Sequence, residues 1–187
     1  MAEITPAQAF MMTRRSRPLR TLSKPAPKKH AVDLMLRIAS RVPDHGKLEP
    51  WRFVVLEEPA LKRIAAMAPP HIERIDAPSL AASQYADSPF AIVVLESPRL
   101  DSKIPRIEQT YSTAAVCMQL VNAALAGGWG VNWLSGALSH DADFAEEAFG
   151  ALPHERVAGV IHIGTCEETP SDRPRPDLDA KTTWMSA

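Results

Sequence analysis

The chain has 187 residues, 45% of them hydrophobic, with 21 Lys and Arg against 22 Asp and Glu and a formal net charge of -1. This length suits one domain with its own core, and the charge excludes a globally basic nucleic-acid-binding protein and a highly charged disordered chain. Cys117 and Cys166 are too far apart for a CxxC pair and too few for a four-cysteine zinc site, so we expect a reducing, cytoplasmic environment. No apolar run approaches the roughly 20 residues that span a bilayer.

Charge is distributed unevenly along the chain. Residues 1–30 contain seven bases and one acid, a net +6, so the remainder carries -7. An Arg-rich, acid-poor N-terminus is also typical of a transit peptide. Against targeting, Thr5-Pro6 is a helix start with proline at the first helical position, and no secretory apolar segment follows. We therefore expect this segment to be part of the folded protein.

Hydrophobic periodicity and capping signals predict the helices and strands. In chain order they are a helix at about 28–40, a strand at 52–57, a helix that includes 61–67, a strand at 91–96, a helix at 108–126, a strand at 130–134, a helix capped by Ser139 that runs to Phe149, and a strand at 156–164. The helix at 108–126 is apolar nearly all round, which places it in the core or at a subunit interface. Irregular alternation of helices and strands indicates a layered α/β or α+β domain.

The C-terminal segment is predicted to be an arm. Pro170–Pro176 (PSDRPRP) is kept extended by its prolines, and Thr182-Thr183-Trp184 is strand-prone. Such a segment suits an arm that leaves its own domain and pairs with another sheet edge; a frayed terminus is the alternative. We therefore divide the chain into a domain at 1–169 and an arm at 170–187.

Two polar segments precede the first buried strand. Arg14-Arg15-Ser16-Arg17 can fork onto a phosphate, since each charge-assisted bond contributes about 1.5–3 kcal/mol; the alternative is a solvated surface run. Asp44-His45 lies in a loop that ends at Pro50-Trp51-Arg52-Phe53 and could act as a general acid and base, or His45 could simply bond within the loop. The other histidines are scattered, so we expect no metal.

Glycine is concentrated in the third segment. Four of the eight glycines fall in Gly127–Gly136, directly after the long predicted helix. The segment is not a Rossmann GxGxxG, because it follows a helix and precedes a strand, and it contains no GxSxG nucleophile elbow. Ser135-Gly136 can offer backbone N–H donors. A helix cap and a turn would explain Gly127 and Gly128 but not Gly136.

Taken together and in this order, these three segments resemble the FMN-dependent nitroreductases. Pro105–Gln109 at the start of the long helix and Ile163-Gly164 at the end of a strand fit the same family. The likeness covers nearly the whole chain and is strongest to the short NAD(P)H nitroreductases whose loop reads Pro-Asp-His. It implies an α+β fold with three α/β/α layers, a central mixed, mostly antiparallel sheet, and a homodimer that exchanges its C-terminal arms.

The resemblance also implies residue roles. Arg41 and His45 would reach the flavin of the partner subunit, and a backbone donor near Ser135 or Gly136 would face flavin N5, so that no side chain is catalytic. The FMN phosphate and ribityl chain would be bound by Arg14, Arg15, Ser16, Arg173 and Arg175. The isoalloxazine would be lined by Trp133, Leu134, Ser135 and Gly136. NAD(P)H would be met by Ala123, Ala124, Leu125, Ala126, Gly127 and Gly128.

The implied activity is hydride transfer from NAD(P)H through FMN to a nitroaromatic, quinone or similar acceptor by a ping-pong mechanism. The charge distribution fits, because a phosphate dianion requires concentrated cations in a chain of near-zero net charge. Two alternatives are an FMN-dependent dehydrogenase or oxidase of an organic substrate, and a non-catalytic nucleic-acid-binding module that uses the basic N-terminus.

One departure from the family leaves a role unassigned. Many members place Arg or Lys two residues after the serine, where it steadies negative charge at flavin N1 and O2, but Pro18 stands there in this chain. Arg17, Arg52 and Arg106 are three candidates for that role. Glu49 also replaces the usual Gln before Pro-Trp, so the contacts to the pyrimidine edge differ from those of most members.

Overall fold

The computed structural model describes residues 3–186, apart from the side chains of Ser79 and Leu80. Its helices are α1 (Pro6–Thr13), α2 (Lys29–Ala39), α3 (Glu58–Arg74), α4 (Ser83–Ala86), α5 (Arg106–Ala126) and α6 (Ala142–Phe149). Its strands are β1 (Trp51–Leu56), β2 (Ala91–Glu96), β3 (Gly130–Leu134) and β4 (Arg156–Gly164). Every strand begins within one residue of its predicted start, because each is a compact apolar run.

The four strands form one sheet in the order β1-β2-β4-β3. We expected a mixed, mostly antiparallel sheet, but all three pairings among the described strands are antiparallel. A single register shift lies between Val94 and Leu95, where β2 faces β4. β1 and β3 are the edge strands, so each has one side that no other strand of the described chain covers.

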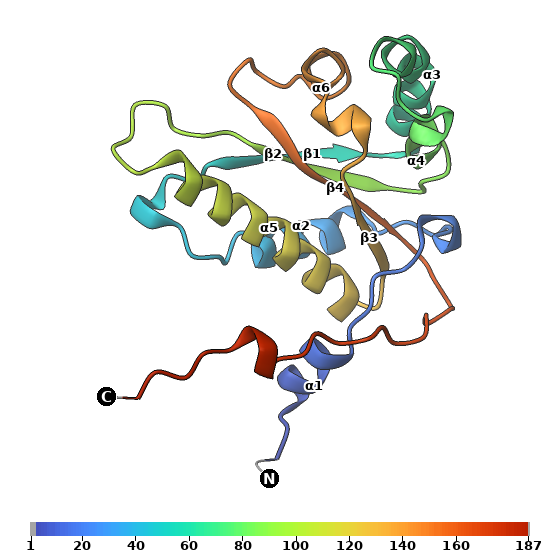
Figure 1. The fold of residues 1–187 in the computed structure, drawn as a ribbon. Helices are drawn as coiled ribbons and strands as arrows, with labels where there is room; N and C mark the ends of the chain where they lie inside the picture. Colours follow the sequence, from blue (N-terminus) through green and yellow to red (C-terminus); the bar gives the residue numbers. More distant parts are fainter. Residues whose placement is uncertain (1–2, 187) are drawn as a thin grey trace.

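Helices cover both faces of the sheet and make the expected three layers (Figure 1). On one face, α3 and α6 enclose a cluster that includes Leu61, Tyr85 and Phe144. On the other face, α2 and α5 enclose a second cluster that includes Met35 and Leu120. β2 lies between the two clusters, and all six of its residues are buried. Because both of its faces are covered, its sequence is a nearly continuous apolar run.

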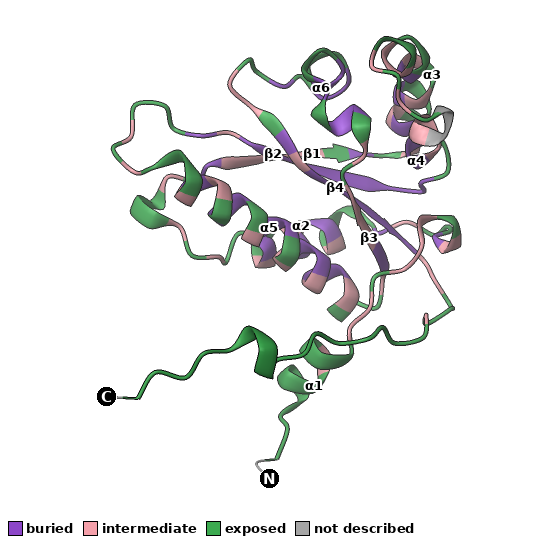
Figure 2. Cartoon of the chain, viewed as in Figure 1, coloured by how far each residue is buried: buried purple, intermediate pink, exposed green. Residues whose placement is uncertain are grey.

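Helix α5 lies in the core along one side, which confirms one of the two environments predicted for it. One side packs on the sheet, and residues such as Val116 and Leu120 are fully buried there. The opposite side is open, since Ile107, Tyr111 and Met118 are exposed. Figure 2 shows the change from buried to exposed across the helix. The described residues contain no helix long and apolar enough to cross a membrane.

Two local predictions require comment. Ser139 does not cap the following helix: it lies in a 3-10 turn at Ala137–His140, and the Asp141 side chain caps α6 by accepting from the N–H of Asp143. Residues 182–184 form no strand within this chain, although Thr182 has an extended backbone. The C-terminal segment lies exposed beside α1 and then points away from the domain (Figures 1 and 2).

Candidate functional site

The Arg14–Arg17 segment lies beside β3. The capping box of Thr5 and Gln8 fixes the start of α1, and the extended backbone of Pro18 leads the chain away from its end. The N–H of Arg17 donates to the carbonyl of Val131 (2.8 Å), and the Asn132 side chain donates to the carbonyl of Arg17 (2.6 Å). These bonds hold the predicted phosphate-binding segment against the strand that carries Trp133 and Leu134.

The C-terminal segment brings further arginines to the same place. Arg15 donates to the carbonyl of Ser171 and lies 3.6 Å from the carboxylate of Asp172. Arg175 donates to Asp172 (2.7 Å) and to the carbonyl of Met12 (3.0 Å). Residues separated by about 160 positions are therefore gathered into one basic cluster, as the resemblance implied for the phosphate site. Asp172 within it was not anticipated from the sequence.

The Arg14 side chain, in the same segment, carries an unpaired polar atom. Its Nε atom is buried and has no hydrogen-bond partner among the described residues. A buried guanidinium N–H without an acceptor is costly, because it has lost water and gained nothing in return. An anion bound in the cluster would supply the acceptor.

The predicted wall at Trp133–Gly136 adjoins this cluster. The Trp133 indole packs over Gly159 of β4, where any Cβ would collide with it. Beyond the strand, Ser135 is exposed and Gly136 lies against the buried amide of Gln84. Gln84, which is 7% exposed and packs beneath a Cβ position of Gly136, carries no motif that would have identified it.

The end of α5 is only partly accessible. Ala126, Gly127 and Gly128 are exposed, and Gly128 has a φ of 82° that favours glycine. Ala123 and Ala124 are 5% and 0% exposed. The predicted NAD(P)H contact is therefore corrected for these two side chains, which pack into the core because α5 turns them towards the sheet.

The loop with His45 is held firmly on the first turns of α5. The Ser112 hydroxyl donates to the carbonyl of Pro43 (2.7 Å), and Asp44 accepts from the N–H of Glu49 (2.8 Å). Nδ1 of His45 lies 2.7 Å from a carboxylate oxygen of Glu108, while two thirds of the imidazole side chain stays exposed. Glu108 thus fixes the ring and leaves Nε2 to face outwards; the sequence identified His45 but not this partner.

Arg41 and His45 do not meet the arginine cluster within one chain. Their loop lies against the N-terminal end of α5, whereas α5 runs on to the glycines that precede β3 (Figure 1). A helix of 21 residues is about 30 Å long. The described chain therefore carries two separate groups of predicted site residues.

The structure separates the three candidates for flavin N1 and O2. Arg17 donates to the carbonyl of Arg15 (2.6 Å) and so lies within the cluster. Arg52 instead pairs with Glu155 (2.6 Å), and Arg106, at the start of α5, lies 3.9 Å from Glu96. Only Arg17 adjoins the other predicted ligands.

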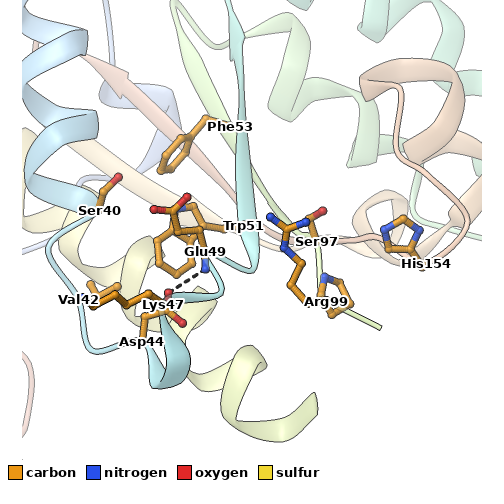
Figure 3. A pocket seen from close by; sticks show the side chains of 11 residues that line it. Ser40, Val42, Asp44, Lys47, Glu49, Trp51, Phe53, Ser97, Arg99 and His154 are labelled. Carbon is orange, nitrogen blue, oxygen red and sulfur yellow. Dashed lines mark hydrogen bonds between the residues drawn. The ribbon is translucent and has the colours of Figure 1, made fainter. Parts of the chain in front are cut away.

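A cavity of about 830 Å³ lies at the start of β1 (Figure 3). Trp51 and Phe53 stand on one side of it, and Arg99 and His154 on the other. It includes Asp44 but none of the residues predicted to hold the cofactor. No group of three or more His, Cys, Asp and Glu side chains in the described part of the chain could hold a metal ion.

Comparison with known proteins agrees with the geometry. The family model "Nitroreductase family" matches residues 11–165. The chain is 31% identical over 148 residues to "Putative NAD(P)H nitroreductase YdjA" of Escherichia coli, covering 77% of this chain and 80% of that protein. It is 30% identical over 167 residues to a "Putative NAD(P)H nitroreductase" of Haemophilus influenzae, covering 85% and 88%.

Solved structures share the fold. A nitroreductase-like family protein from Bacillus cereus superposes with a TM-score of 0.81 at 23% identity, covering all of both chains. A "putative nitroreductase in complex with fmn" from Desulfovibrio desulfuricans gives a TM-score of 0.74 at 20% identity, covering 94% of this chain and 95% of that one.

Replacing Arg52 tests whether it stabilises the fold through Glu155 rather than binding the flavin. Arg52→Gln leaves the Glu155 carboxylate buried without its ion partner, and we expect a loss of about 2 kcal/mol of unfolding free energy in urea denaturation at neutral pH. Breaking a fully buried pair costs about 3–5 kcal/mol, and Arg52 is 36% exposed. The control Arg63→Gln, on an exposed side chain, should change stability by less than about 0.5 kcal/mol.

The pH dependence of this loss has a definite sign. Burial alone would raise the pKa of Glu155, but the hydrogen bonds from Arg52, the Leu152 N–H and Ser97, together with the charge of Arg52, outweigh it and the pKa falls to about 2. The stabilisation is therefore present above the ordinary carboxylate pKa of about 4.5 and is lost as pH falls towards 2. Loss of flavin from Arg52→Gln with unchanged stability would contradict the assignment.

Proposed function

The chain belongs to the nitroreductase family, and we propose that it is a cytoplasmic, homodimeric FMN-dependent NAD(P)H oxidoreductase. Bound FMN would accept hydride from NAD(P)H at N5 and pass two electrons to a nitroaromatic, quinone or similar acceptor in a ping-pong scheme. The observation that carries the proposal is the gathering of Arg15, Arg17 and Arg175 beside the strand that bears Trp133.

The residues of the cluster suit the phosphate of FMN. Its oxygens would give the buried Nε of Arg14 the acceptor that it lacks in the chain. Arg15 and Arg175 present further guanidinium donors, and Ser16 adds a hydroxyl in the same segment. Arg173 lies on the same arm and completes the set. Guanidinium groups match phosphate oxygens in both geometry and charge.

The flavin ring would lie along Trp133, Leu134, Ser135 and Gly136. A backbone N–H from Ser135 or Gly136 would face N5 without adding an ionisable group to the site. Arg17, one residue from the usual family position, would steady negative charge at N1 and O2, because it is the one candidate that adjoins Arg15.

NAD(P)H would approach over the exposed end of α5. Leu125 is half-buried, and Ala126, Gly127 and Gly128 are exposed. Side chains this small would let the flat nicotinamide of NAD(P)H come close to the flavin ring. The role of the chain here is positioning, since a hydride donor and its acceptor need to stack face to face.

A dimer would unite the two separated groups of site residues. Arg41 and His45 lie about one length of α5 from the cluster, so they would serve the flavin of the partner subunit. Ile107, Tyr111 and Met118 recur at helical spacing on the open side of α5 and are exposed. An exposed apolar stripe on a core helix is typical of a subunit interface.

We propose that residues 170–187 form an arm, separate from the domain at 1–169, whose C-terminal end reaches the partner subunit. Trp184 and Met185 are 92% and 95% exposed in the single chain. β1 offers a free edge, and the cavity beside it has Trp51 and Phe53 on its wall. A strand-prone segment can pair with such an edge and bury its large side chains alongside.

A flavin spectrum tests the function as a whole. Purified protein should show flavin absorbance or acquire it when FMN is added and the excess removed, and anaerobic NADH or NADPH should bleach it. Protein that stays colourless after FMN is added would contradict the proposal. Bleaching by an organic donor but not by pyridine nucleotide would favour a dehydrogenase or oxidase, and salt-sensitive nucleic-acid binding without flavin would favour a binding module.

Removing two predicted phosphate ligands should weaken cofactor binding. For Arg14→Ala combined with Ser16→Ala, we expect the Kd for FMN to rise on the order of 100-fold, because two charge-assisted bonds are lost. Flavin fluorescence titration measures the Kd, and circular dichroism should show an unchanged apoprotein fold. Arg20→Ala removes an exposed charge nearby and should leave the Kd unchanged; equal losses in both variants would show a general charge effect.

Two truncations separate the proposed roles of the arm. Deleting residues 182–187 should raise the dimer dissociation constant at least tenfold in sedimentation equilibrium, since an anchoring Trp typically contributes about 2 kcal/mol or more. FMN should still bind where this variant is dimeric, because Arg173 and Arg175 remain. Deleting residues 170–187 should weaken both dimer and cofactor; a tight dimer that retains FMN would rule out the arm exchange.

A further inference from the structure

An acid lies at the centre of the cations assigned to the FMN phosphate. One oxygen of Asp172, Oδ1, accepts from Nη2 of Arg175 (2.7 Å) and from the backbone N–H of Arg173 (2.9 Å). Nη1 of Arg15 lies 3.6 Å from the same oxygen. One carboxylate oxygen thus accepts two hydrogen bonds from its own segment and pairs with a cation from the other end of the chain.

Asp172 is ionised in this setting and free to move. The N–H of Arg173 and the Arg175 guanidinium lower the pKa of Asp172 below its ordinary value. Its side chain is 64% exposed, and it lies in an extended segment without regular secondary structure. Exposed ion pairs of this kind contribute little stability, so the carboxylate can turn into solvent at small cost.

We propose that the Asp172 carboxylate takes the place of the FMN phosphate in the apoprotein and is displaced when FMN binds. The proposal rests on the proposed function, because that assigns Arg15 and Arg175 to the phosphate. Displacement follows from charge: the phosphate carries nearly two negative charges on three oxygens, and the carboxylate carries one on two. Asp172 therefore lowers the affinity for FMN while it holds the like-charged side chains of Arg15 and Arg175 together beforehand.

The test compares FMN with riboflavin, which lacks the phosphate. Fluorescence titration of Asp172→Asn should give a Kd for FMN about three- to fivefold lower than that of the unmodified protein, the range expected for loss of one exposed ion pair. The Kd for riboflavin should stay the same. Glu168→Gln removes the same charge from an exposed position four residues earlier and should change neither value.

Three results would overturn the proposal. They are an unchanged or higher Kd for FMN in Asp172→Asn, an equal gain for riboflavin, and an equal gain in Glu168→Gln. If the unmodified protein binds no flavin, the proposed function fails, and thermal unfolding with inorganic phosphate at fixed ionic strength decides the role of Asp172. Phosphate should then raise the melting temperature of Asp172→Asn more than that of the unmodified protein; equal shifts would refute displacement.

Discussion

The rigid length of α5 is the constraint on which the site depends. A helix of 21 residues holds its two ends about 30 Å apart, and it cannot bend freely while one side is buried against the sheet. The arginine cluster and Trp133 therefore cannot approach His45 within one chain. A flavin bound by both groups, as proposed, would need a second copy of the chain, and its binding would then depend on dimer formation.

The His45 loop moves with α5 because hydroxyl groups on the helix hold it. Ser112 donates to the carbonyl of Pro43 (2.7 Å), and Thr113 donates to that of Pro50 (2.9 Å). Both carbonyls belong to the segment that contains His45, so the two bonds attach this segment to the helix. The loop is thus part of the same rigid unit as the exposed stripe, and an interface that positions α5 also positions His45.

The sequence predicted local structure well because the strands are compact apolar runs and α5 ends at glycine. It failed where distant residues decide. Ser139 and Asp141 are both good helix caps, and Asp141 is the cap in a structure where Arg74 and His71, nearly 70 residues away, bond to its carboxylate. The pairing of Arg52 with Glu155 and the burial of Ala123 likewise depend on residues far away in the sequence. Arg14–Arg17 could be singled out from the sequence itself, but their meeting with the arginines of the arm was predicted only through the family resemblance, and Asp172 was not predicted at all.

The proposed anion site explains why positive charge is concentrated at the start of the sequence. A net +6 in the first 30 residues would repel the arginines of the C-terminal arm unless an anion lies between them, and Asp172 provides one from the arm itself. In the proposed dimer, the arm that carries Arg173 and Arg175 also carries Trp184 to the partner. Ordering one end of the arm then lowers the entropic cost of ordering the other. FMN binding and dimer assembly should therefore strengthen each other by the same factor, as linkage requires.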